Sequence, residues 1–120
     1  MLADAKELLQ ESIDRLEEMV QRGREVSDNE ELRAALDRLS SMATELKPVL
    51  GKVYLKTRQG LSAVVPIHDR VGEIAETLRE AIDRGDPISV LADVQDALDE
   101  LESNVISLRA TVASRDVVMT

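Results

Sequence analysis

LKPVLGKVYLKTRQGLSAVVPIH, residues 46–68, is the segment whose conformation sets the architecture of the whole chain. It contains the single tyrosine, the single histidine, two of the three prolines and two of the five glycines among 120 residues. It also contains four Lys/Arg residues and no Asp or Glu, although the formal net charge of the chain is -9. Three architectures have to be separated here: two helices joined by a turn, a β-hairpin between helices, or one long bent helix.

The spacing of apolar residues favours two helices joined by a turn. Apolar residues recur every three or four positions, as on one face of a bundle helix. Before the turn, a helix over residues 29–59 carries Leu32, Leu36, Leu39, Ala43, Leu46, Leu50 and Val53. After it, a helix over residues 62–84 carries Val64, Ile67, Val71, Ile74, Leu78 and Ala81. Pro48 is expected to bend or divide the first helix, and residues 57–60 are interpreted as its cationic last turn, closed by Gly60.

Two alternatives stay open at this point. The β-branched residues of KVYLKT and LSAVV also allow a β-hairpin around the RQG tripeptide. The three-four phase continues from the first helix through Gly60 to Val64 without a slip, which argues against that hairpin. The same unbroken phase allows a single bent helix over residues 29–84, which would need a dimer to bury its apolar face.

The flanking segments predict two further helices, over residues 2–26 and 87–115. Ser27 and Asp28 are good N-caps for the helix that follows them, and residues 84–87 combine a C′ glycine, an N-cap aspartate and an N1 proline. On the wet side of the first helix, the spacing predicts i,i+4 ion pairs between Glu11 and Arg15 and between Glu18 and Arg22.

Four segments of similar length with short connections predict one all-α domain spanning residues 1–120. We expect an antiparallel up-down-up-down four-helix bundle with a heptad-like aliphatic core. The chain contains no Phe, no Trp and one Tyr, so the core must be built from aliphatic side chains. In this topology the turn within residues 46–68 lies at the same end of the bundle as both termini.

Composition excludes several classes of function. Without cysteine there is no disulfide, thiol catalysis or thiolate metal site. One histidine cannot supply the Glu-x-x-His pairs of a carboxylate-bridged metal centre, so we expect no metal and no cofactor. The acidic balance argues against nucleic acid and anionic membranes as partners. No apolar run is long enough to span a membrane and the N-terminus is charged, so a cytoplasmic location is expected.

The acid-free basic segment predicts a contact surface for another protein. Its apolar residues exceed what one buried helix face needs, so some of them should be exposed or meet another chain, with a locally wide core as the alternative. The candidate partner-binding residues are Lys47, Lys52, Tyr54, Leu55, Lys56, Arg58, Leu61 and Val65. Tyr54 is the preferred anchor. We therefore expect a non-enzymatic interaction or oligomerisation module, binding itself as a homodimer or another helical or acidic protein.

His68 supplies the alternative function. Gly72 lies one turn beyond it on the same helix face and leaves room for an approaching protein. The run His68-Asp69-Arg70-Val71-Gly72-Glu73 resembles the phosphoacceptor segment of one class of sensor histidine kinases. A bundle of this length with one exposed histidine also resembles histidine phosphotransfer domains. This resemblance implies phosphotransfer through His68, although Pro66 precedes it closely and Val71 stands where those domains carry a lysine.

Overall fold

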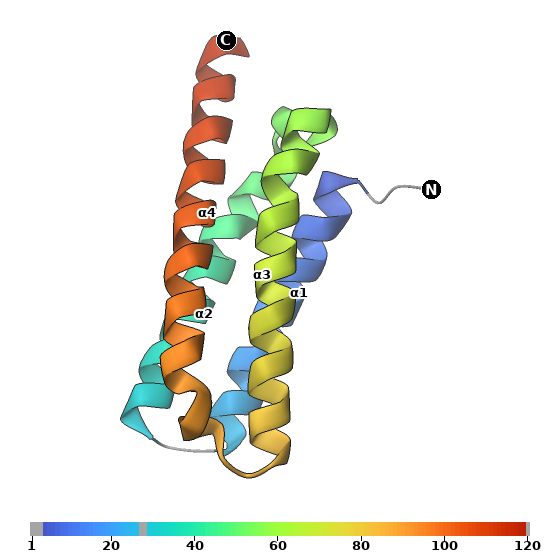
Figure 1. The fold of residues 1–120 in the computed structure, drawn as a ribbon. Helices are drawn as coiled ribbons and strands as arrows, with labels where there is room; N and C mark the ends of the chain where they lie inside the picture. Colours follow the sequence, from blue (N-terminus) through green and yellow to red (C-terminus); the bar gives the residue numbers. More distant parts are fainter. Residues whose placement is uncertain (1–3, 27–28, 120) are drawn as a thin grey trace.

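The computed structural model describes residues 4–26 and 29–119, which form four long helices with no strand among them. The helices are α1 (Ala5–Val26), α2 (Glu30–Leu46), α3 (Arg58–Asp83) and α4 (Leu91–Met119). Three short 3₁₀ turns complete the described chain: η1 (Lys47–Gly51), η2 (Val53–Lys56) and η3 (Pro87–Val90). Successive helices run in opposite directions (Figure 1), so the predicted up-down-up-down four-helix bundle is confirmed.

The order of the helices around the bundle differs from their order along the chain. Helix α1 packs against α2 and α3, and α4 packs against the same two helices. Helices α2 and α3 therefore occupy opposite corners, and the connection over residues 47–57 crosses the bundle end diagonally. This connection, the start of α1 and the end of α4 lie at one end of the molecule, and α4 projects beyond the other helices there (Figure 1).

Apart from Tyr54, the described core is aliphatic, and it closes within one chain. Each helix buries a row of apolar residues at three-four spacing, here called its stripe, which includes Leu9 and Leu16 in α1 and Val105 in α4. Ser12 also lies on the stripe and is fully buried, and its hydroxyl donates a hydrogen bond of 2.8 Å to the Leu8 carbonyl. A buried hydroxyl satisfied in this way avoids the cost of an unpaired polar group. The alternative of a single bent helix over residues 29–84 was therefore wrong, because α2 and α3 are separate helices that each pack against α1 and α4.

The helix caps agree only partly with the sequence. Asn29 caps α2, since its Oδ1 accepts hydrogen bonds from the backbone N–H groups of Glu31 and Leu32 at 2.9 and 3.1 Å. The expected caps Ser27 and Asp28 lie outside the described residues. Gly85 is the expected C′ glycine, with φ +77° and its N–H donating to the Ile82 carbonyl. Asp86 makes no side-chain cap bond, and Pro87 opens η3 before α4 begins.

The prediction that the helix beginning at residue 29 continues to residue 59 was wrong. Helix α2 ends at Leu46 because Pro48 has no N–H to donate, and Lys52 then adopts an extended conformation. Thr57 is the N-cap of α3 rather than part of a last helical turn, so α3 begins four residues earlier than predicted. Pro66 consequently lies inside α3, on its exposed side, where water can replace the missing backbone bond. The β-hairpin alternative is also wrong, since this segment forms 3₁₀ turns.

The predicted ion pairs along α1 do not form within the described structure. Glu11 contacts His68 of α3 instead of Arg15, and the Arg22 guanidinium lies 3.7 Å from the Asp83 carboxylate of α3. Long side chains at a helix seam reach the neighbouring helix as easily as the next turn. Glu11 and Arg22 therefore connect α1 to α3 rather than stabilise α1 alone.

Candidate functional site

The connection over residues 47–57 covers one end of the core. Val49, Tyr54 and Leu55 are buried, with 4, 8 and 4% of their surfaces exposed. Tyr54 and Leu55 were predicted as contacts to another chain, with Tyr54 as the anchor. Here they pack into the core of their own chain. The structure thus matches the alternative of a locally wide core at these two positions.

A tight junction fixes this connection to the first turn of α3. The Thr57 hydroxyl donates to the Tyr54 carbonyl at 2.8 Å and accepts from the Gly60 N–H at 2.9 Å. A Cβ on Gly60 would overlap the Tyr54 carbonyl oxygen and lie 2.9 Å from the Leu55 Cα. Position 60 therefore requires glycine because backbone approaches backbone there. The sequence had suggested a different role, that of a C′ residue.

The four cations of the segment lie around this covered end. Lys56 and Arg58 are exposed, and neither forms an ion pair with any residue that the structure describes. Lys47 is exposed and its Nζ lies 3.5 Å from Oε1 of Glu17, a distance and exposure at which an ion pair contributes little. Lys52 is partly buried and has interactions of its own. Two of the four cations are thus available to a partner.

Two apolar side chains, Leu61 and Val65, lie beyond Arg58 on the first two turns of α3. Leu61 and Val65 follow Arg58 at steps of three and four, so the three residues share one side of the helix. Leu61 is half-buried against the core, whereas 37% of Val65 is exposed. We call Lys47, Lys52, Lys56, Arg58, Leu61 and Val65 the cationic end of the bundle.

His68 is half-buried at the seam between α3 and α1. Its Nε2 lies 2.9 Å from Oε2 of Glu11, within hydrogen-bonding distance. If Nε2 donates to this carboxylate, it carries a proton and has no lone pair for attack on phosphorus. A phosphoryl group at Nε2 would also meet the negative charge of Glu11. The geometry around His68 therefore gives phosphotransfer no support.

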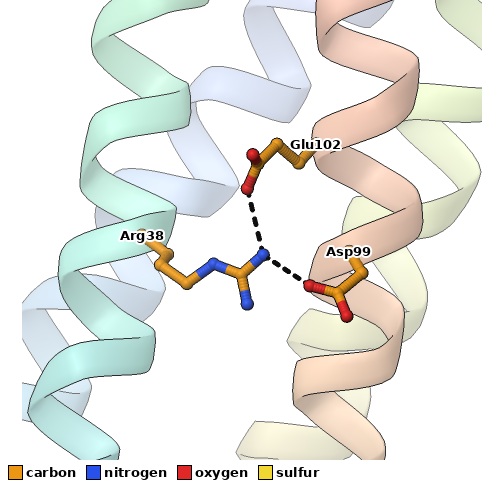
Figure 2. Close-up of polar contacts among 3 residues, drawn as sticks. All are labelled: Arg38, Asp99 and Glu102. Atoms are coloured by element: carbon orange, nitrogen blue, oxygen red, sulfur yellow. Dashed lines mark hydrogen bonds and ion pairs between the residues drawn. The ribbon is translucent and has the colours of Figure 1, made fainter.

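Arg38 of α2 connects α2 to the acidic side of α4. Its Nη2 donates to Oδ1 of Asp99 at 2.8 Å and to Oε2 of Glu102 at 3.0 Å (Figure 2). The hydrogen bond to Asp99 raises the pKa of Arg38; burial opposes this rise and the bond to Glu102 adds to it. One guanidinium thus satisfies two carboxylates one turn apart.

Arg70 of α3 makes the corresponding link on the other side of α4. It contacts Glu73 of its own helix at 2.9 Å and Glu100 of α4 at 2.5 Å. Its Nε is buried without a hydrogen-bond partner among the described residues. The acidic outer face of α4 is therefore partly neutralised by an arginine from each neighbouring helix.

Sequence reasoning missed both arginines. Each directly precedes a stripe residue, Leu39 or Val71, and so lies at the boundary of the core. A basic residue at such a position, facing a helix rich in acids, was the available signal. Their role in the described structure is to hold α4.

The described residues contain no group of three or more His, Asp or Glu side chains placed to hold a metal ion. Within the same part of the chain, no helix is long and apolar enough to cross a membrane. Comparison with protein-family models, with curated proteins and with solved structures finds no match. The function must therefore be inferred from the geometry of the site.

Proposed function

We propose that the chain is a small non-enzymatic interaction module that binds an acidic surface of another protein through its cationic end. The observation that carries this proposal is the exposure of Lys56 and Arg58 without described ion-pair partners, in a chain of net charge -9. Val65 and the half-buried Leu61 supply apolar area beside these cations. A polar, charged rim around a small apolar centre is typical of protein interfaces.

The packing beneath this surface supports the same proposal. Tyr54 and Leu55 are buried, and Gly60 lies directly against their backbone, so the segment that carries the cations is well packed. A pre-organised surface loses less side-chain and loop entropy on binding than a mobile one. Tyr54 then acts by packing beneath the segment that carries the cations rather than by contacting the partner.

A protein partner fits this surface better than nucleic acid or an anionic membrane does. The overall charge would repel an extended polyanion. The one aromatic side chain is buried and so is not available for base stacking. A second copy of the chain meets this description of an acidic partner, because Asp93 and Asp96 place carboxylates on the outer face of α4. A cytoplasmic location is part of the same proposal.

Light scattering over a range of protein concentrations tests self-association. The variant Lys56→Glu/Arg58→Glu/Val65→Asp changes only exposed side chains of the cationic end. The control Arg24→Glu/Arg84→Glu/Ile88→Asp makes the same change of charge on exposed side chains at the opposite end of the bundle. If the wild type forms dimers, the first variant should be monomeric and the control dimeric. Equal dimerisation of both variants would contradict self-association through the cationic end.

If the wild type is monomeric, a heterologous acidic partner is tested by titrating the ¹⁵N-labelled protein with a glutamate-rich helical peptide. We expect amide shifts over residues 56–65 that weaken at high salt and are lost in the first variant. Shifts spread evenly over the bundle, or retained in that variant, would overturn the proposal.

A separate measurement tests phosphotransfer through His68. After incubation with acetyl phosphate, we expect no phosphohistidine signal by ³¹P NMR in the wild type. A signal that disappears in His68→Gln would reinstate His68 as a phosphoacceptor.

A further inference from the structure

A surface groove of about 290 Å³ lies between α1 and α3, in the half of the bundle nearer Gly85. Met19 and Leu78 form a buried apolar floor, and the half-buried Gly72 and Ala75 leave the hollow above it. The groove is smaller than the roughly 300–1,000 Å³ of enclosed small-molecule sites. Its open apolar floor suits side chains that enter from a partner.

Three arginines border this groove. Arg15 lies across Gly72, where a Cβ would be 3.3 Å from its Nη1, and Arg15 has no ion pair among the described residues. Arg22 lies 3.7 Å from Asp83, and Arg79 lies 4.0 Å from Glu76. Asp83, Arg79 and Glu76 are largely exposed and the Arg22 side chain is 43% exposed, so these long ion pairs contribute little stability. The guanidinium groups can therefore turn to carboxylates of a ligand at small cost.

The spacing of these arginines matches a helix. Arg15 and Arg22 are seven residues apart on α1, which is two turns or about 10 Å. Gly72 and Arg79 are also seven residues apart on α3, and α1 and α3 run in the same direction (Figure 1). A docked amphipathic helix places its anchors at i, i+3 or i+4, and i+7, over the same two turns.

Two acidic residues lie beside the arginines of the groove. Glu18 and Glu76 also line the groove, so its lining holds three cations and two anions. That balance is positive, whereas the whole chain carries -9. Arginine forms paired hydrogen bonds with carboxylates, so a ligand with acids beside its apolar face is the complementary one.

We propose that the α1–α3 groove docks an acidic amphipathic helix of a partner protein. Its apolar side chains fill the hollow over Gly72 and Ala75, and its flanking carboxylates pair with Arg15, Arg22 and Arg79. A second copy of the chain does not fit this description. Among the described side chains of α4, only Ile106 is a large exposed apolar residue, so its outer face lacks an apolar row. The groove is separate from the cationic end and does not depend on the function proposed for it.

The probe is a synthetic amidated helix of about 15 residues with leucines at i, i+3, i+7 and i+10 and glutamates on both flanks. Titration into the ¹⁵N-labelled protein should shift the amides of Gly72 and Ala75, and calorimetry should give a saturable isotherm. The peptide with lysines in place of glutamates should not bind. Neither should a peptide of the same composition with its leucines spread around the helix.

Two variants test the two halves of the interaction. Arg15→Glu/Arg79→Glu should weaken binding at least about tenfold, since it replaces two charge-assisted contacts by repulsion. Ala75→Leu fills the hollow without changing charge and should weaken binding comparably. The control Lys56→Glu/Arg58→Glu loses the same charge at the cationic end and should leave affinity nearly unchanged. Thermal melting verifies that each variant is folded.

Three outcomes would contradict the proposal that the α1–α3 groove docks an acidic helix. The first is the absence of saturable binding by a folded wild type. The second is equal binding of the lysine peptide. The third is binding that shifts residues 56–65 and is lost in Lys56→Glu/Arg58→Glu, which would assign the peptide to the cationic end. Loss of the groove signal alone leaves the proposed function of the cationic end untouched.

Discussion

The two ends of the bundle are closed in different ways. At the end containing Gly85, a short turn joins α3 to its neighbour α4, and one positive φ angle completes the reversal. At the other end, residues 47–57 must cross from α2 to α3 at the opposite corner. That longer path places Val49, Tyr54 and Leu55 over the core and leaves cations on its outside. The diagonal connection thus covers the core with three buried apolar side chains, whereas Pro87 is the one buried residue of the described α3–α4 connection.

The largest expected effect comes from removing the cover of the core. Leu55→Asp should lower the free energy of unfolding by about 3–5 kcal/mol, because it removes a buried aliphatic side chain and introduces an unpaired charge. Urea unfolding followed by circular dichroism measures this. The control Ile106→Asp alters a side chain that is 57% exposed and should change stability little. Similar losses in both variants would mean that residues 47–57 do not cover the core.

The second effect tests the junction between the connection and α3. Gly60→Ala should cost about 1–3 kcal/mol, as for an overpacked site, because the new Cβ displaces the Tyr54 carbonyl. That displacement also disturbs the hydrogen bond from Thr57 Oγ1. Gly51→Ala is the matched control, since nothing lies within 4 Å of a Cβ there. Its free energy of unfolding should stay the same or rise by about 0.4–1 kcal/mol. Equal stability of the two variants would show that backbone contact at Gly60 is not limiting.

A smaller effect is expected at the short turn. Gly85→Ala forces a side chain into the left-handed region at φ +77°, at a cost of roughly 1–2 kcal/mol. Nothing lies within 4 Å of a Cβ at this position, so the cost is conformational rather than steric. A Gly85→Asn variant should recover part of the loss in a thermal melt, because asparagine tolerates this region better. Failure of asparagine to improve on alanine would argue against conformational strain as the cause.

The smallest effect on stability is expected for the cations of the covered end. Lys56→Glu/Arg58→Glu should leave the urea midpoint unchanged, because these exposed side chains have no described ion pairs to lose. A marked fall in the midpoint would mean that the cations serve the fold, and it would weaken the case for a partner surface. Together with Leu55→Asp, this measurement separates the inside of the connection from its outside.

Apolar periodicity predicted the long helices well because each of them buries one continuous stripe. It misled at residues 47–60, where the phase continues although the helix does not. Val49 and Leu55 are buried by folding over the core rather than by facing a neighbouring helix. Pro48 marked the break correctly. The residue types of Thr57 and Gly60, however, are equally compatible with the end of one helix and the start of the next. Only the close approach of the Tyr54 backbone shows that both residues belong to the start of α3.

The sequence predicted which charges the candidate site carries, but not which of its side chains are exposed. Lys56 and Arg58 stood out by composition and are exposed, whereas Tyr54 stood out in the same way and is buried. A sequence reports which side chains a segment carries, but their exposure depends on where the segment crosses the bundle.

By itself, the sequence determined an all-α chain with four amphipathic helices, an aliphatic core and an acid-free basic segment, because these follow from composition and local periodicity. The tertiary structure decided which helices are neighbours and therefore that the basic segment crosses a diagonal. It also decided the partners of Arg38 and Glu11, and it formed the arginine-lined groove between α1 and α3. The physical reason is that such contacts depend on the relative placement of whole helices, which no local pattern of residues specifies.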